Sequence, residues 1–279
     1  MDVDKQDVEY LRHGGKAFMA TVYRPKGAGP FPAVVEAHGG AWVGGERANN
    51  EPINRAVAAG GVVVVALDFR NPPEATYPGS VADVNYAIRW LKSEAAPFGT
   101  RPELVGAMGT SSGGHLAVLN GMKPRDSRYA AIPAPGGFDA RVPYVVTLWP
   151  VICPLGRYRA HIAHPPEGTR PGRGGAAQMQ VQYWLTEDAM GEGSCLMALE
   201  RGDKVELPSI LYLQNPNDPL HPRPLLDAFV AAYRKRGGKV ELMLFEGSQY
   251  DLPRSDPASP GARQIVDRIV SFIHAEARR

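Results

Sequence analysis

Short apolar runs alternate with longer amphipathic segments along most of this sequence. Several of the short runs are apolar on both faces, as the central strands of a parallel sheet are. Seven runs have strand length: residues 17–25, 31–38, 61–69, 103–109, 144–150, 208–214 and 239–245. Most are followed by a break and then a helical segment, which is typical of a mostly parallel sheet covered by helices. The sequence therefore predicts an α/β fold, with residues 1–279 as a single domain.

Two helices can be predicted from periodicity. In residues 80–96 and 262–279, apolar side chains recur at steps of three and four residues, which gives each segment an apolar stripe. The stripes are Val81, Val84, Ala87, Ile88 and Leu91 in the first segment and Ile265, Ile269, Phe272 and Ile273 in the second. Both helices are expected to pack on the sheet.

One segment, residues 153–207, interrupts the alternation. It begins with a region rich in Gly, Pro and Arg, of which "HPPEGTRPGRGGAAQ" is the loosest part, and continues into a stretch with helical content. A connection this long inside a compact fold is usually a lid or a binding loop. We predict a small cap inserted between two strands.

Charge and cysteine content exclude several classes of protein. Lys and Arg number 31 against 29 Asp and Glu, so no electrostatic feature favours nucleic acid or an anionic membrane as partner. Cys153 and Cys195 lack a metal-ligand spacing, although a single disulfide stays possible. The N-terminus is charged and no apolar stretch reaches about 18 residues. We expect a cytoplasmic protein with a small-molecule ligand and no membrane partner; the oligomeric state cannot be read from the sequence.

The motif Gly109-Thr110-Ser111-Ser112-Gly113 lies between a predicted strand and a predicted helix. In that context it matches a nucleophile elbow, where small residues permit a tight turn that presents the serine above the edge of the sheet. The alternative is an ordinary glycine-rich turn. The context favours Ser111 as a nucleophile.

Two further segments could complete an acyl-transfer site. In "EAHGGAWVGGE", the backbone N–H groups of Gly39 and Gly40, with that of Ser112, could stabilise a developing oxyanion. In "LYLQNPNDPLHP", Asp218 follows a strand at the edge where α/β sheets collect functional residues. A carboxylate there could orient an imidazole, although the same residue could simply form a turn.

Together, "HGGAW", "DFRNPPEATYP", "GTSSGGH" and "NPNDPLHP" resemble the α/β-hydrolase fold of the hormone-sensitive-lipase and acetyl-esterase type, which includes bacterial esterases related to feruloyl and acetylxylan esterases. The resemblance runs from about Val22 to the C-terminus. It implies Ser111 as nucleophile, Asp218 as triad acid, and Gly39, Gly40 and Ser112 as oxyanion-hole donors. It also implies short or medium carboxylic esters as substrates, a reaction that needs no metal or organic cofactor.

The chain departs from this family at position 250. Members typically carry a Gly-x-x-His pattern after the last strand, but here Gly247 is followed three residues later by Tyr250. A phenol with a pKa near 10 is protonated at neutral pH and cannot act as the base. A triad without its histidine would hydrolyse esters poorly, so the sequence predicts a weakened esterase.

Three explanations stay open for this departure. A substitute base could come from elsewhere, with His221 the nearest candidate by sequence and His115, His161 and His164 weaker ones. Alternatively, the pocket survives in a binding protein or a non-hydrolytic enzyme, with Tyr250 as a hydrogen-bond donor. The third explanation is a recent or introduced replacement in a competent enzyme.

Three large side chains are candidates for contacts with a substrate. Trp42 follows the glycine-rich loop, and Tyr183 and Trp184 lie in the predicted cap. Large apolar residues are more often simply part of the core. Their positions beside the glycine-rich loop and in the predicted cap nevertheless predict that these three side chains line an acyl or aromatic pocket.

Overall fold

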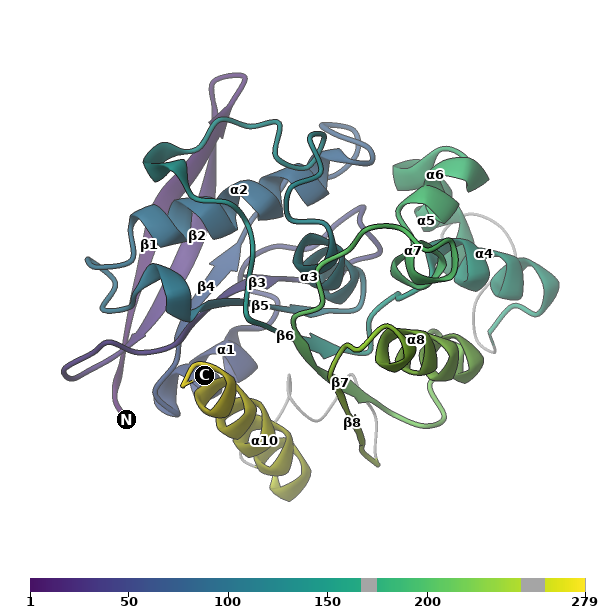
Figure 1. Ribbon diagram of the computed structural model, residues 1–279. Coiled ribbons are helices and arrows are strands. Elements are labelled where there is room, and N and C mark those ends of the chain that lie inside the picture. Colours follow the sequence, from purple (N-terminus) through teal and green to yellow (C-terminus); the bar gives the residue numbers. More distant parts are fainter. Residues whose placement is uncertain (167–174, 247–258, 279) are drawn as a thin grey trace.

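The computed structural model describes residues 1–166, 175–246 and 259–278, and these form a sheet flanked by helices (Figure 1). Within these ranges the sheet has eight strands in the order β1-β2-β4-β3-β5-β6-β7-β8. Their bounds are β1 Val3–His13, β2 Lys16–Pro25, β3 Ala33–Ala37, β4 Val63–Leu67, β5 Val105–Thr110, β6 Tyr144–Leu148, β7 Ser209–Gln214 and β8 Val240–Leu244. The strands from β4 to β8 in this order run parallel, which confirms the predicted mostly parallel sheet.

Strand β1 was not predicted from the sequence. It pairs antiparallel with β2 at the edge of the sheet, and β2 pairs antiparallel with β4. Most of the β1 side chains are exposed, and several are charged. An exposed edge strand needs no apolar run, and charge on such a strand guards against pairing with another chain.

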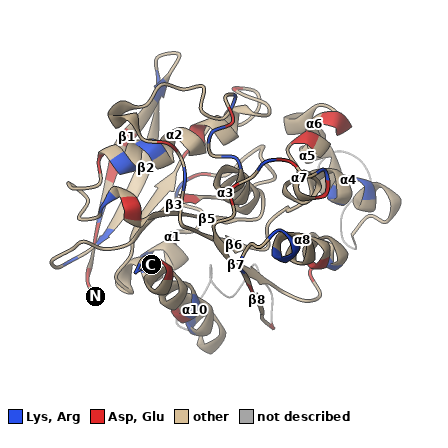
Figure 2. Cartoon of the chain, viewed as in Figure 1, with Lys and Arg blue, Asp and Glu red and all other residues tan. Residues whose placement is uncertain are grey.

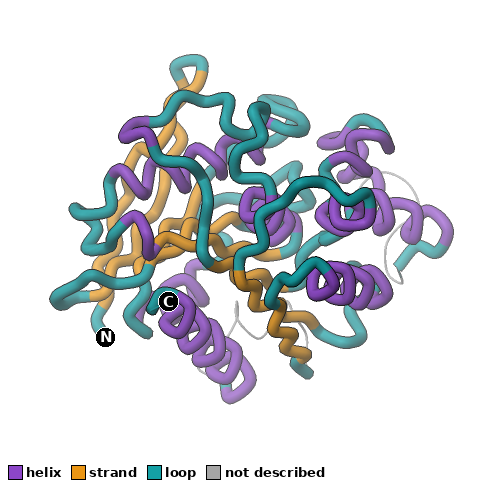
Figure 3. The backbone as a smooth tube through the Cα atoms, viewed as in Figure 1, coloured by secondary structure: helices purple, strands orange, loops and turns teal. Residues whose placement is uncertain are grey.

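Helices cover both faces of the sheet (Figure 3). On one face, α1 (Glu51–Ala59) and α10 (Pro260–Glu276) share an apolar core with the sheet. The other face is covered by α2 (Gly79–Ser93), α3 (Ser112–Met122) and α8 (Arg223–Lys235). The two helices predicted from periodicity correspond to α2 and α10.

Four short helices lie between β6 and β7 and gather beside α8 (Figure 1). They are α4 (Pro154–Ala163), α5 (Ala176–Trp184), α6 (Glu187–Glu192) and α7 (Cys195–Glu200). All four fall within residues 153–207, the segment predicted as a cap. We refer to α4–α7 and their connections as the helical insertion.

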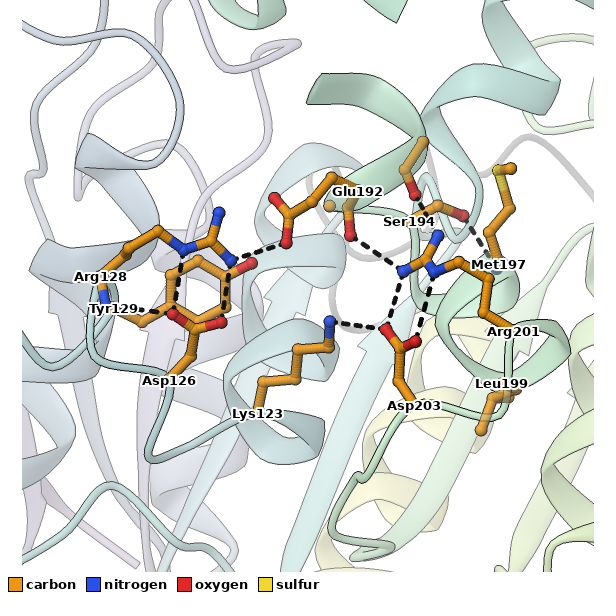
Figure 4. Close-up of polar contacts among 12 residues, drawn as sticks. Lys123, Asp126, Arg128, Tyr129, Glu192, Ser194, Met197, Leu199, Arg201 and Asp203 are labelled. Carbon is orange, nitrogen blue, oxygen red and sulfur yellow. Dashed lines mark hydrogen bonds and ion pairs between the residues drawn. The ribbon is translucent and has the colours of Figure 1, made fainter. Parts of the chain in front are cut away.

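Ion pairs join the helical insertion to the loop that follows α3 (Figure 4). Asp203 accepts from Lys123 at 2.9 Å and from Arg201 at 2.8 Å, and Arg128 donates to Glu192 at 2.7 Å. Pairs that are partly exposed contribute at most about 1 kcal/mol each. The apolar contacts described below therefore account for more of the attachment.

In the described part of the chain, Lys and Arg are interspersed with Asp and Glu (Figure 2). Among the described residues, no helix combines the length and apolarity needed to cross a membrane.

Candidate active site

Ser111 occupies the turn between β5 and α3, with φ of 53° and ψ of −118°. A residue with a side chain rarely adopts a positive φ, and such strain persists only where the surroundings enforce it. Here the start of α3 packs directly on the end of β3. A Cβ atom on Gly113 would clash with the carbonyl groups of Ala37 and His38, so only glycine permits this approach.

Asp218 and His221 lie on one short loop that follows β7, and both are buried. The Asp218 carboxylate accepts hydrogen bonds through Oδ1 from the amide groups of Leu220 at 2.8 Å and His221 at 3.2 Å. Its Oδ2 lies 2.7 Å from Nδ1 of His221. Gln214, at the end of β7, donates to the His221 carbonyl at 2.8 Å. One carboxylate thus holds both the backbone and the ring of His221.

The imidazole of His221 faces Ser111, with 3.2 Å between its Nε2 and the serine Oγ. Strands β5 and β7 are separated in the sheet only by β6, and the carboxyl ends of parallel strands meet at one edge. The structure therefore brings together Ser111, His221 and Asp218 in one hydrogen-bonded line. This geometry is the one expected if a substitute histidine is present. Tyr250 lies outside the described residues.

The protonation of His221 follows from its partners. Burial lowers the pKa of His221, and the hydrogen bond to Asp218 opposes that shift in part. An ionised carboxylate can only accept, so the ring proton sits on Nδ1 and the Nε2 lone pair points toward Ser111. This is the tautomer that a general base for Ser111 requires.

The glycine-rich loop after β3 lies against Ser111. A Cβ atom on Gly39 would stand 3.3 Å from the Cβ of Ser111, and Gly40 has φ of 128°, which favours glycine. No hydrogen bond joins the amide N–H of Gly39 or Gly40 to another described residue. Ser112 is the first residue of α3, where an N–H group has no acceptor within the helix.

Trp42, Tyr183 and Trp184 are all buried where the glycine-rich loop meets the helical insertion. The Trp42 ring stacks on Tyr183, with 5.7 Å between centroids, and meets the edge of Trp184 at 5.3 Å. Aromatic pairs at such distances stabilise a contact beyond the area they bury. These residues join the insertion to the loop, and their contact with a substrate stays a prediction.

A small cavity of about 10 Å³ lies beside His221, and several of the residues around it were not predicted from the sequence. Its wall includes Arg157 and Gln214 among apolar side chains. The Arg157 guanidinium donates twice to Gln180, at 3.0 and 2.7 Å, and lies 5.3 Å from the Trp42 ring. No spacing in the sequence indicates these contacts. One feature of the sequence could have identified Gln214 as a site residue, since it lies at the end of a buried strand.

Comparison with known sequences finds esterases among the relatives of this chain. A family described as BD-FAE matches residues 21–147. A probable isoprenylcysteine alpha-carbonyl methylesterase from Oryza sativa is 25% identical over 88% of this chain and 58% of its own length. Esterase LipC from Mycobacterium tuberculosis is 34% identical over 50% of this chain and 34% of its own. The chain thus spans little more than half the length of the plant relative.

Solved structures match nearly the whole chain. EstE1, a thermostable carboxylesterase cloned from a metagenomic library, has a TM-score of 0.77 at 24% identity, covering 98% of this chain and 89% of its own. An esterase from Pyrobaculum calidifontis has a TM-score of 0.76 at 25% identity, covering 99% and 85%. The strand order, the serine between β5 and α3 and these matches show that the chain has the α/β-hydrolase fold and is related to the carboxylic ester hydrolases.

Proposed function

We propose that this protein is a serine hydrolase of short or medium carboxylic esters in which His221 is the general base. The observation that carries the proposal is the hydrogen-bonded line from Ser111 Oγ to His221 Nε2 at 3.2 Å and from His221 Nδ1 to Asp218 at 2.7 Å. The nucleophile and its base are within reach of each other, and a third group orients the base. The sequence predicts weak ester hydrolysis because Tyr250 stands in place of the family's histidine. That prediction assumes that no other imidazole lies beside Ser111. With His221 there, we expect turnover that depends on both residues.

The proposed reaction has two halves. As the Ser111 oxygen attacks the ester carbonyl carbon, its proton passes to Nε2 of His221, and the carbonyl oxygen becomes an oxyanion. The intermediate collapses when the imidazolium returns the proton to the departing alkoxide, which leaves as an alcohol. Water then attacks the acyl carbon as the same nitrogen takes its proton, and the imidazolium returns this proton to Ser111 Oγ as the acid is released.

The groups around Ser111 stabilise the charges that form during the proposed reaction. Asp218 keeps the imidazole in the required tautomer and stabilises the imidazolium that forms in each half-reaction. The lowered pKa of His221 keeps its base form populated at neutral pH. We assign the oxyanion to the N–H groups of Gly39, Gly40 and Ser112, since donors preorganised at that position contribute most to such chemistry.

The proposed substrate class rests on the relatives. The plant relative is described as a methylesterase, LipC and the Pyrobaculum protein as esterases, and EstE1 as a carboxylesterase. Among the described residues, basic and acidic positions are interspersed along the chain, which does not favour a polyanion as partner (Figure 2). We therefore propose small neutral esters as substrates.

The test is hydrolysis of p-nitrophenyl acetate and butyrate by the native chain and by Ser111→Ala, with folding checked by circular dichroism. We expect rapid hydrolysis by the native chain and near-background hydrolysis by the variant, together with a single fluorophosphonate adduct on Ser111. Equal rates for the two proteins and no adduct would refute the proposal. A catalytically degenerate binding protein would then be the better description.

A further inference from the structure

His115 is a buried histidine that the proposed reaction does not use directly. It lies in the first turn of α3, where its backbone N–H donates to the Ser111 carbonyl at 3.1 Å. Its Nδ1 stands 3.3 Å from the indole Nε1 of Trp42, and its Nε2 stands 2.8 Å from the carbonyl oxygen of Gly193. One imidazole therefore contacts both the glycine-rich loop and the helical insertion.

The two contacts determine one tautomer of His115. A backbone carbonyl only accepts and an indole N–H only donates, so Nε2 carries the proton and Nδ1 accepts from Trp42. Complete burial lowers the pKa of His115 to about 4, which keeps the ring neutral at physiological pH. A charged ring would present a second donor to the Trp42 N–H and lose that bond.

Trp42 ends a strained turn that follows the proposed oxyanion donors. Ala41 and Trp42 both have left-handed backbones, with φ of 52° and 61°, and the turn is closed by a hydrogen bond from Val43 N–H to Gly40 O at 3.0 Å. Residues with side chains hold such values only where their contacts enforce them. The Trp42 side chain supplies those contacts, and among the described residues His115 is the recorded acceptor for its N–H.

Packing against aromatic rings holds Gly193, the second hydrogen-bond partner of His115, in place. Gly193 follows α6, and a Cβ atom there would stand 2.5 Å from the ring of Trp184 and 3.1 Å from that of Tyr77. Trp184 in turn meets the edges of both Trp42 and His115. The Gly193 carbonyl is thus held in the same aromatic cluster that covers the glycine-rich loop.

We propose that His115 is a positioning residue, which ties Trp42 to the helical insertion and so holds the amide groups of Gly39 and Gly40 at the distance from Ser111 that oxyanion stabilisation requires. The inference rests on the proposed function. It makes the position of the helical insertion a determinant of the chemical step, because the insertion acts on the oxyanion donors through His115 and Trp42.

Three substitutions separate the two hydrogen bonds. His115→Asn can keep an acceptor near the Nδ1 position for Trp42, His115→Gln can keep a donor near the Nε2 position for Gly193, and His115→Phe keeps only the ring. We expect kcat per folded molecule to fall by about threefold to tenfold for the Asn and Gln variants, each of which breaks one of the two contacts, and by about tenfold to a hundredfold for Phe, which breaks both, with KM little changed. Asn120→Ala is the matched control, because Asn120 is a buried polar residue further along α3.

A boronic acid gives a second readout, since its tetrahedral adduct with serine places an oxygen in the oxyanion hole. Its affinity should fall in parallel with kcat for His115→Phe and stay native for Asn120→Ala, even where the two variants lose similar stability. An unchanged kcat and boronate affinity in folded His115→Phe would overturn the inference. If all three His115 variants and Asn120→Ala lose kcat to the same extent, His115 has only a structural role and the inference is overturned. If the native chain is no faster than Ser111→Ala, the proposed function itself fails and the inference falls with it.

Discussion

Replacement of His221 tests the central feature of the site. The distances of 3.2 Å to Ser111 and 2.7 Å to Asp218 describe one unit, in which the serine is activated only through the imidazole. Removing either member of such a unit abolishes the same step. We expect His221→Ala and Ser111→Ala each to lower kcat/KM for p-nitrophenyl butyrate by at least about 10³-fold, or about 4 kcal/mol of transition-state stabilisation.

The double variant Ser111→Ala/His221→Ala makes the prediction sharper. Two independent contributions would multiply to a loss of about 10⁶-fold, whereas residues acting as a unit should lose no more together than either does alone. Initial rates under pseudo-first-order conditions, with the background rate subtracted, distinguish these outcomes. Because His221 is buried, His221→Gln serves as a second variant that fills more of the space and should be equally inactive.

Two controls separate His221 from other candidate bases. His164, exposed at the end of α4, should tolerate replacement by Ala without loss of activity. Tyr250→His should give no gain, since the place beside Ser111 is already held by an imidazole. The reasoning is refuted if His221→Ala stays within about tenfold of the native rate while Ser111→Ala is inactive. A large gain in Tyr250→His would instead support the view that position 250 is the base position.

Three further predictions concern stability. The folded pKa of His115, about 4, lies below its ordinary value of 6.5, so its contribution to stability is complete above pH 6.5 and lost as pH falls toward 4. Relative to His115→Phe, the native free energy of unfolding should drop by about 3 kcal/mol over that range, and a pH-independent difference would contradict this. Gly113→Ala should unfold or inactivate the protein because of its clash with carbonyl groups at the end of β3, while Gly44→Ala, with open space around it, should be neutral in urea unfolding. Glu192→Ala removes the partner of a guanidinium and of the half-buried phenol of Tyr77, and should cost about 1–2 kcal/mol in the same assay. Arg128→Ala should cost less than about 1 kcal/mol because its ion pair is partly exposed, and the reverse order would contradict the assignment.

Much of the fold follows from local patterns that the sequence carries. Alternating apolar runs and amphipathic segments predict the parallel strands, and periodicity predicts α2 and α10, because burial of one face depends on spacing alone. The elbow at Ser111 is equally local, since Gly109 and Gly113 permit the turn that the strand and helix around it require. Strand β1 escaped prediction because an exposed edge strand carries no such pattern.

The partner of Ser111 was decided only by tertiary structure. Residue 221 is 110 positions away in the chain, and in the sequence it is one loop histidine among several. Its role depends on the order of β5, β6 and β7, which brings two loops to one edge, and on the Asp218 carboxylate, which turns the ring toward the serine. Likewise, the sequence presents Trp42 as a large side chain near the site, but only packing against Tyr183 and His115 buries it and gives it a place in the loop. Local spacing determines which elements form, whereas contacts between distant segments determine which side chains meet.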